Sequence, residues 1–121
     1  TCALPIYILI YPYLLNMGHI ITDSETNNLI FNYLDNQGFI QVDKNDNIYF
    51  VNSEADEHAQ IRFDKRDGLC YIYYKLTNEI SRLFSIKESN SEKIIGMWIE
   101  NTVQMSVTTT GITIDYYLSF S

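Results

Sequence analysis

The stretch that most constrains the fold of this chain covers residues 58–76, where two strand-like segments flank an Asp-Gly pair. Every second residue of the first segment is apolar, which is typical of a strand with one buried and one solvated face. Asp67 and Gly68 favour a tight turn, because both tolerate the positive φ that such a turn needs. The segment 69–76 is apolar or aromatic on both faces. We therefore expect a β-hairpin whose second strand is central and covered on both sides.

A helix and two more strands are expected before this hairpin. Thr22-Asp23-Ser24-Glu25 has the Ser/Thr-x-x-Glu form of a capping box, and apolar residues at helical spacing follow it as far as Gly38, a typical stop. Strand patterns then cover 39–42 and 48–52, joined by the polar turn 43–47. Together with the hairpin this predicts four consecutive strands in an antiparallel meander.

After Leu76 the apolar period changes from 2 to 3.6 residues, which indicates two helices. Thr77 or Asn78 could cap the first of them. Ser89-Asn90-Ser91-Glu92 has the form of a second capping box, and Ile94, Trp98, Ile95 and Ile99 begin two apolar rows after it. The pattern also allows a fifth strand over 112–118. The predicted fold class is α+β: an N-terminal helix, a four-stranded antiparallel meander and two C-terminal helices packed on the sheet.

The length of 121 residues fits one domain, which we place at residues 17–121. Residues 1–16 are interpreted as a leader that is either non-native or translated from an untranslated region. Codons ACG TGT GCT CTT CCG ATC would encode the first six residues, and that string resembles a common sequencing adapter. The uncharged start also contains Pro5, Pro12, Asn16 and His19, and it lacks a basic segment. We therefore expect neither a secretory signal nor a membrane span there.

The charge and the cysteine content narrow the function classes. Lys and Arg total 8 against 15 Asp and Glu, so the net charge is −7 and a phosphate backbone would be repelled. Nucleic acid is therefore not expected as a ligand. Cys2 and Cys70 are too few for a disulfide framework, which favours a reducing, cytoplasmic location.

No motif in the chain predicts catalysis, a metal site or a cofactor. Asp43, Asn45, Asn47 and Glu54 match ligand positions of an EF-hand calcium loop, but Ile48 replaces the glycine of its sharp turn. The glycines never cluster into a phosphate-binding loop, and Gly-x-Ser-x-Gly is missing. We therefore predict a non-enzymatic chain with no cofactor, no metal site and no catalytic residues.

The acidic charge and the ten tyrosines favour a protein-binding function. The prediction is a non-catalytic module of bacterial or phage origin that binds a basic protein, such as an immunity or antitoxin protein or a secretion chaperone. The runner-up is a small enzyme or ligand-binding domain with a pocket between helices and sheet. The predicted partner-binding residues are Glu54, Asp56, Glu57 and His58, with Tyr49 as an aromatic anchor.

Overall fold

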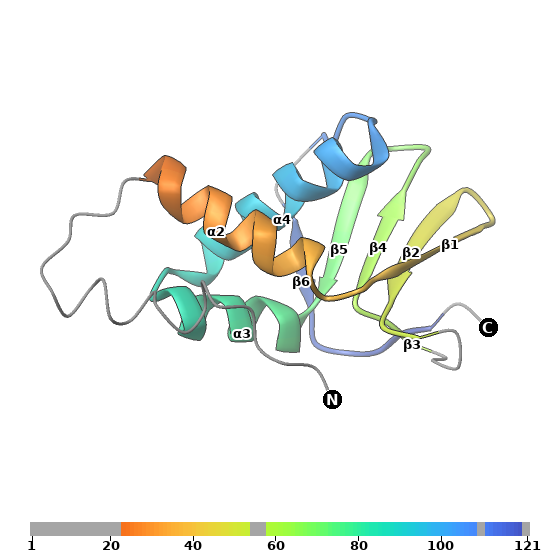
Figure 1. Ribbon diagram of the computed structural model, residues 1–121. Helices are drawn as coiled ribbons and strands as arrows, with labels where there is room; N and C mark the ends of the chain where they lie inside the picture. The colour runs from red at the N-terminus through yellow and green to blue at the C-terminus, as the bar shows by residue number, and fades with distance from the viewer. Residues whose placement is uncertain (1–22, 54–57, 109–110, 120–121) are drawn as a thin grey trace, which may run out of the picture.

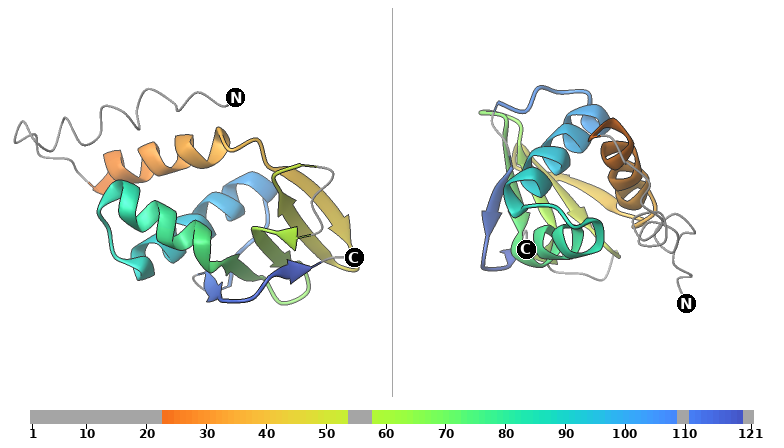
Figure 2. Two further views of the ribbon diagram at one scale, coloured as in Figure 1. Left: turned by 90° about the horizontal axis from the view of Figure 1, so that it is seen from below. Right: turned by 90° about the vertical axis from the view of Figure 1, so that its left-hand side faces the viewer.

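In the described part of the chain, a five-stranded mixed sheet forms the centre of the fold, and three helices cover one of its faces (Figures 1 and 2). The computed structural model describes residues 23–53, 58–108 and 111–119. The elements in chain order are α2 (Asp23–Asp35), β1 (Ile40–Lys44), β2 (Asn47–Val51), β3 (His58–Ala59), β4 (Ile61–Asp64), β5 (Leu69–Tyr73), α3 (Tyr74–Phe84), α4 (Glu88–Val103), β6 (Ile112–Ile114) and β7 (Leu118–Ser119).

The strand order in the large sheet is β1-β2-β4-β5-β6. The first four strands pair antiparallel in succession, so the predicted meander is confirmed. β6 pairs parallel to β5, and α3 and α4 form the crossover that a parallel connection requires. The α+β class with one helix before the strands and two after them is therefore confirmed, while the sheet is mixed because of its last strand. β3 and β7 form a separate two-stranded sheet.

The two hairpin turns of the meander differ in length and in backbone conformation. Between β1 and β2, Asn45 and Asp46 both adopt positive φ in a two-residue turn, as the Asx-rich sequence suggests. Between β4 and β5 the loop has four residues, 65–68, because Asp64 pairs with Leu69. In that loop only Gly68 has positive φ, at 73°. The prediction that Asp67 shares the left-handed conformation is therefore wrong.

The central strand ends earlier than its apolar pattern predicts. β5 stops at Tyr73, and α3 begins at Tyr74 without a side-chain cap. The predicted continuation of the strand to Leu76 and the predicted caps at Thr77 or Asn78 are wrong. The physical reason is the helical row Leu76, Ile80 and Phe84, which is buried only if the chain is already helical at Leu76.

The predicted capping box before α4 is also wrong. The helix begins at Glu88, and Lys87 is its N-cap without a side-chain cap hydrogen bond. Ser91 is buried inside the helix, where its Oγ lies 2.7 Å from Ser81 Oγ on α3. The Glu92 carboxylate binds Thr113 on β6. These polar side chains join neighbouring elements instead of capping their own helix.

Two apolar clusters lie on the two faces of the sheet. The larger one fills the space between the sheet and the helices, and its fully buried members include Ile30, Leu34, Phe50, Ile61, Phe63, Cys70, Ile72, Ile80, Ile95 and Ile99. The smaller one lies on the opposite face, which we call the outer face, and consists of Tyr49, Val51, Ala59, Tyr73 and Leu118. The alternation of strand side chains produces both clusters.

The first predicted helix is confirmed as α2, whose Ile30, Tyr33 and Leu34 are buried. Gly38 follows it with a φ of 71°, as expected of a residue that ends a helix. Thr22, the first residue of the predicted capping box, and the leader interpreted at 1–16 lie outside the described residues.

Candidate functional site

The outer face carries one row of side chains that crosses all five strands of the large sheet. The strand register aligns Val42, Tyr49, Arg62, Tyr71 and Ile112. None of the described helices lies on this face, as the end-on view in Figure 2 shows. The row therefore places two tyrosines and a guanidinium on the side of the sheet away from the main core.

Arg62 lies at the centre of that row. Its guanidinium carbon is 4.4 Å from the centroid of the Tyr71 ring, which is the geometry of a cation–π contact. Its Nε is buried and has no hydrogen-bond partner among the described residues. The Tyr71 ring thus contacts a guanidinium that has one unpaired nitrogen.

An aromatic stack lies next to the row and draws its rings from three distant segments. We use the name aromatic stack for His58, Tyr73 and Tyr117. Tyr117 is the middle ring, with its centroid 4.4 Å from that of His58 at an interplanar angle of 20° and 5.2 Å from that of Tyr73 at 29°. Tyr74 meets Tyr73 edge to face at 5.0 Å. Such contacts orient each ring by means of its neighbours.

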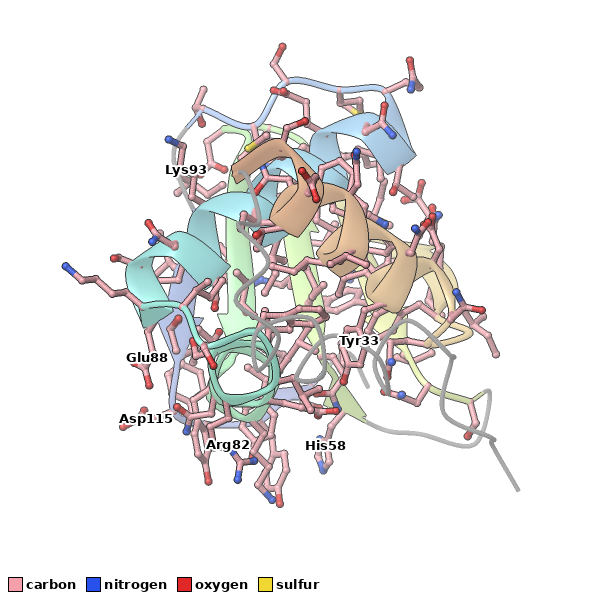
Figure 3. The ribbon with its side chains drawn as sticks, turned by 60° about the vertical axis from the view of Figure 1, so that its left-hand side comes forward. Tyr33, His58, Arg82, Glu88, Lys93 and Asp115 are labelled. Atoms are coloured by element: carbon pink, nitrogen blue, oxygen red, sulfur yellow. The ribbon has the colours of Figure 1, made fainter. Side chains whose placement is uncertain are left out.

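The stack is buried at one end and open at the other. Burial, followed by the neighbouring phenols of Tyr117 and Tyr74, raises the pKa of Tyr73. Tyr117 keeps 56% of its surface exposed, and the adjacent Tyr116 keeps 64%. In Figure 3, His58 points away from the body of the molecule, and Asp115 is labelled along the same lower edge of the view. The site thus presents aromatic surface and polar edges to solvent.

The residues predicted to bind a partner are only partly described. Glu54, Asp56 and Glu57 lie outside the described residues. His58 is exposed and belongs to the aromatic stack. Tyr49 is 7% exposed and lies in the outer-face row beside Arg62. The structure therefore places both described members of the predicted set on the same side of the sheet.

Sequence reasoning missed the most exposed members of this surface. Tyr116 and Tyr117 lie in the link between β6 and β7, and the sequence pattern had included them in one continuous strand. The only sign of this surface in the sequence was the pair of consecutive tyrosines at 116 and 117. The stack itself could not be found from the sequence, because β3 meets β7 only through long-range pairing.

The basic side chains of the β4–β5 turn are engaged by local carboxylates. Arg66 Nη2 lies 3.3 Å from Asp64 Oδ2, and the backbone N–H of Arg66 donates to Asp64 Oδ1 at 2.9 Å. The hydrogen bonds from Arg66 hold the pKa of Asp64 below its ordinary value. Lys65 pairs with Asp43 at 2.8 Å. This turn therefore does not supply a free cationic groove of the kind that nucleic-acid platforms use.

Neither the described pockets nor the buried thiol of Cys70 indicates a catalytic or metal-binding role. One surface pocket of about 470 Å³ lies between α2 and α4 and is lined by residues that include Phe31, Met97, Met105 and Glu100. The described part of the chain contains no group of three His, Cys, Asp or Glu side chains arranged to hold a metal ion. Burial raises the pKa of Cys70 to about 12, so its thiol stays protonated at neutral pH.

No protein-family model, curated protein or solved structure gave a significant match to this chain. Among the described residues, no helix combines the length and the apolar character needed to cross a bilayer. The case for a function therefore rests on the chemistry of the surface described above.

Proposed function

We propose that this chain is a non-catalytic protein-binding module for a basic partner, such as an immunity or antitoxin protein or a secretion chaperone of bacterial or phage origin. The observation that carries the proposal is the partly exposed aromatic stack on a chain of net charge −7. Tyrosine is enriched at protein interfaces because it combines buried area with a hydroxyl group. A surplus of carboxylates speeds the encounter with a cationic protein.

The organisation of the fold supports an interface on the outer face. The helices occupy the other face and bury the large core there. On the outer face Tyr49 and Tyr73 are buried in the smaller cluster, while His58 and Tyr117 are exposed beside it. The stacked rings are held by their neighbours before any partner arrives, which lowers the entropy lost on binding. Glu54, Asp56 and Glu57 directly precede His58 in the sequence and remain the proposed steering charges.

The test first identifies the proteins encoded next to this gene and then measures association of the chain with any of them that is rich in Lys and Arg. We expect a saturable complex whose association rate falls steeply as salt is added. Replacing Glu54, Asp56 and Glu57 together by Gln should slow association and flatten its salt dependence. Replacing Asp43, Asp46 and Asp67 by Asn is the matched control, because it removes the same charge at the hairpin turns. Equal effects of the two triple variants would contradict the placement of the interface, and no complex with the neighbouring product would contradict the function.

A further inference from the structure

The two edges of the large sheet differ in how their backbone groups are covered. At the β6 edge, the backbone N–H of Thr113 donates to Glu92 Oε2 at 3.0 Å, and the N–H of Gly111 donates to the Glu92 carbonyl oxygen at 3.3 Å. At the other edge, β1 has a neighbour on one side only among the described strands, and Figure 1 draws it as the outermost strand. Within the described part of the chain, α4 therefore covers one edge, and β1 leaves the other open.

The tight turn after β1 fixes which of its backbone groups point outward. Residues 45–46 form a two-residue turn, so Lys44 and Asn47, which flank it, are a hydrogen-bonded pair. Hydrogen-bonded and non-hydrogen-bonded pairs alternate along an antiparallel ladder, so the next hydrogen-bonded pair is Val42 with Tyr49. Val42 and Lys44 therefore direct their N–H and C=O groups toward β2.

Gln41 and Asp43 have the opposite orientation and direct their N–H and C=O groups away from β2. A hydrogen bond on the far side of β2 agrees with this alternation. Phe50, which lies opposite Gln41, accepts at its carbonyl oxygen from the backbone N–H of Gln60 at 2.8 Å, so that carbonyl faces the β4 side and not β1. The two outward residues thus offer two donors and two acceptors to a further strand.

β1 is held in place at both ends before any strand is added. The Phe39 ring packs on Phe50 and Trp98, with centroid distances of 6.2 and 5.9 Å. The Asp43 carboxylate pairs with Lys65 at 2.8 Å. Between these points β1 pairs with β2 in continuous register along its whole length. Such an ordered edge loses little entropy when another strand pairs with it.

The sequence of β1 is complementary to itself in one antiparallel register. When Val42 lies opposite Val42 of a second copy, all five residues of β1 pair, and Gln41 lies opposite Asp43 of that copy. The outward backbone groups then meet, and each Gln41–Asp43 pair exchanges two hydrogen bonds. The apolar Val42 side chains meet on the outer face, and no like charges are directly opposite each other. A register centred on Asp43 would instead place two carboxylates opposite each other.

We infer that two copies of this chain pair through β1, antiparallel about a two-fold axis at Val42, and so join their sheets into one. This inference goes beyond the proposed function and does not depend on the basic partner. The net charge of −7 on each copy opposes the approach of two copies. Added salt screens this repulsion, so pairing of the copies strengthens with salt, whereas binding of a basic protein weakens.

Sedimentation equilibrium of the full chain is the first test. The mean mass should rise with concentration from 14.1 kDa toward twice that value, and at a fixed concentration it should rise with salt. Val42→Lys should return it to 14.1 kDa, because two ammonium groups would lie opposite each other at the axis. Val42→Thr is the matched control, since it keeps a β-branched side chain and should still pair. A mass of 14.1 kDa at every concentration and salt level, or a dimer that survives Val42→Lys, would overturn the inference.

Disulfide cross-linking tests the register, in a Cys2→Ser chain whose only remaining native thiol is the buried Cys70. Val42→Cys should form a linked dimer with oxidised glutathione, because the Cα atoms of a non-hydrogen-bonded pair lie about 4.5 Å apart. Lys44→Cys is the control, since in this register Lys44 lies about 13 Å along the strand from Lys44 of the second copy. Equal linking of the two variants, or none in either, would overturn the pairing. If Val42→Lys does not fold, this comparison decides.

The two proposals fail separately. A dimer that strengthens with salt, together with no basic partner, removes only the proposed function. A complex with a basic protein formed by a chain that stays monomeric removes only the pairing through β1. Loss of that complex in Val42→Lys, with no dimer of the parent chain, would mean that β1 receives a strand of the partner, and it would overturn the pairing of two copies.

Discussion

Glu92 on α4 and Thr113 on β6 are joined by two hydrogen bonds to a single carboxylate oxygen, from the backbone N–H at 3.0 Å and from the hydroxyl at 2.7 Å. β6 is one of the two edge strands of the sheet, and an edge strand presents unpaired backbone groups. The Glu92 side chain satisfies one of them. This contact ties the N-terminal part of α4 to the strand that begins the link to the aromatic stack.

Removing this carboxylate should therefore loosen the last part of the fold. We expect Glu92→Ala to lower the free energy of unfolding by about 1.5–3 kcal/mol, because two donors lose a charged acceptor. Glu88→Ala is the matched control in the same helix, where only the favourable interaction with the helix dipole is lost, about 0.3–1 kcal/mol. Urea denaturation measures both. Equal losses from the two variants would show that the contact contributes nothing beyond helix electrostatics.

Two glycines of positive φ offer a comparison in which only the surrounding space differs. A Cβ at Gly38 would meet nothing within 4 Å, whereas one at Gly68 would lie 2.9 Å from Thr108 Oγ1 and 3.0 Å from the Ser106 carbonyl oxygen. Gly38→Ala should cost about 1–2 kcal/mol from the left-handed conformation alone. Gly68→Ala should cost at least about 1 kcal/mol more, because the neighbouring backbone must also shift.

Thermal melts of the two variants under the same conditions give the comparison. Equal melting temperatures, or a less stable Gly38→Ala, would mean that the segment 106–108 yields to the added methyl group without cost.

Leu76 remains the position where a buried charge should be least tolerated. It is 4% exposed on α3, in one row with Ile80 and Phe84. Leu76→Asp should prevent folding at 25 °C, because it would bury a carboxylate among the apolar side chains of the core. Asn78→Asp is the matched control, since it adds the same charge at a half-buried position two residues away. Circular dichroism and a cooperative melt decide, and a soluble Leu76→Asp variant that melts like the control would refute the prediction.

The stability of the chain should fall at alkaline pH because of Cys70. Burial raises the pKa of this thiol from 9.0 to about 12 in the folded state. Above pH 9 the unfolded chain releases the proton and the folded chain retains it, so the thiol's contribution to stability is full below pH 9 and is lost as the pH rises toward 12. The resulting slope should approach about 1.4 kcal/mol per pH unit.

Cys70→Ala isolates this effect, because all other titrating groups stay in place. The slope of the free energy of unfolding against pH, measured by urea denaturation above pH 9, should be shallower in the variant than in the parent chain. Parallel slopes would show that the buried thiol titrates in the folded state as it does in the unfolded chain.

The sequence alone predicted the elements whose signals are local. The alternation around Ile61 and Phe63 marked β4, and the Asx residues at 45–47 marked the first hairpin turn. Gly38 marked the end of α2. The helical rows that begin at Ile94 and Ile95 marked α4. Each of these signals comes from residues that are close together in the sequence. The periodicity of apolar side chains that buries one face of a helix or strand is the same in any compact fold.

Tertiary contacts decided what local patterns left open. Tyr73 and Tyr74 are both aromatic and both suit a strand, yet the helix begins between them because Leu76, Ile80 and Phe84 must reach the core together. Glu92 resembles a capping residue but binds Thr113, since β6 returns beside α4. Tyr117 meets His58 only because β7 pairs with β3. The partners in such contacts are set by the packing of whole elements, and no spacing along the chain encodes them.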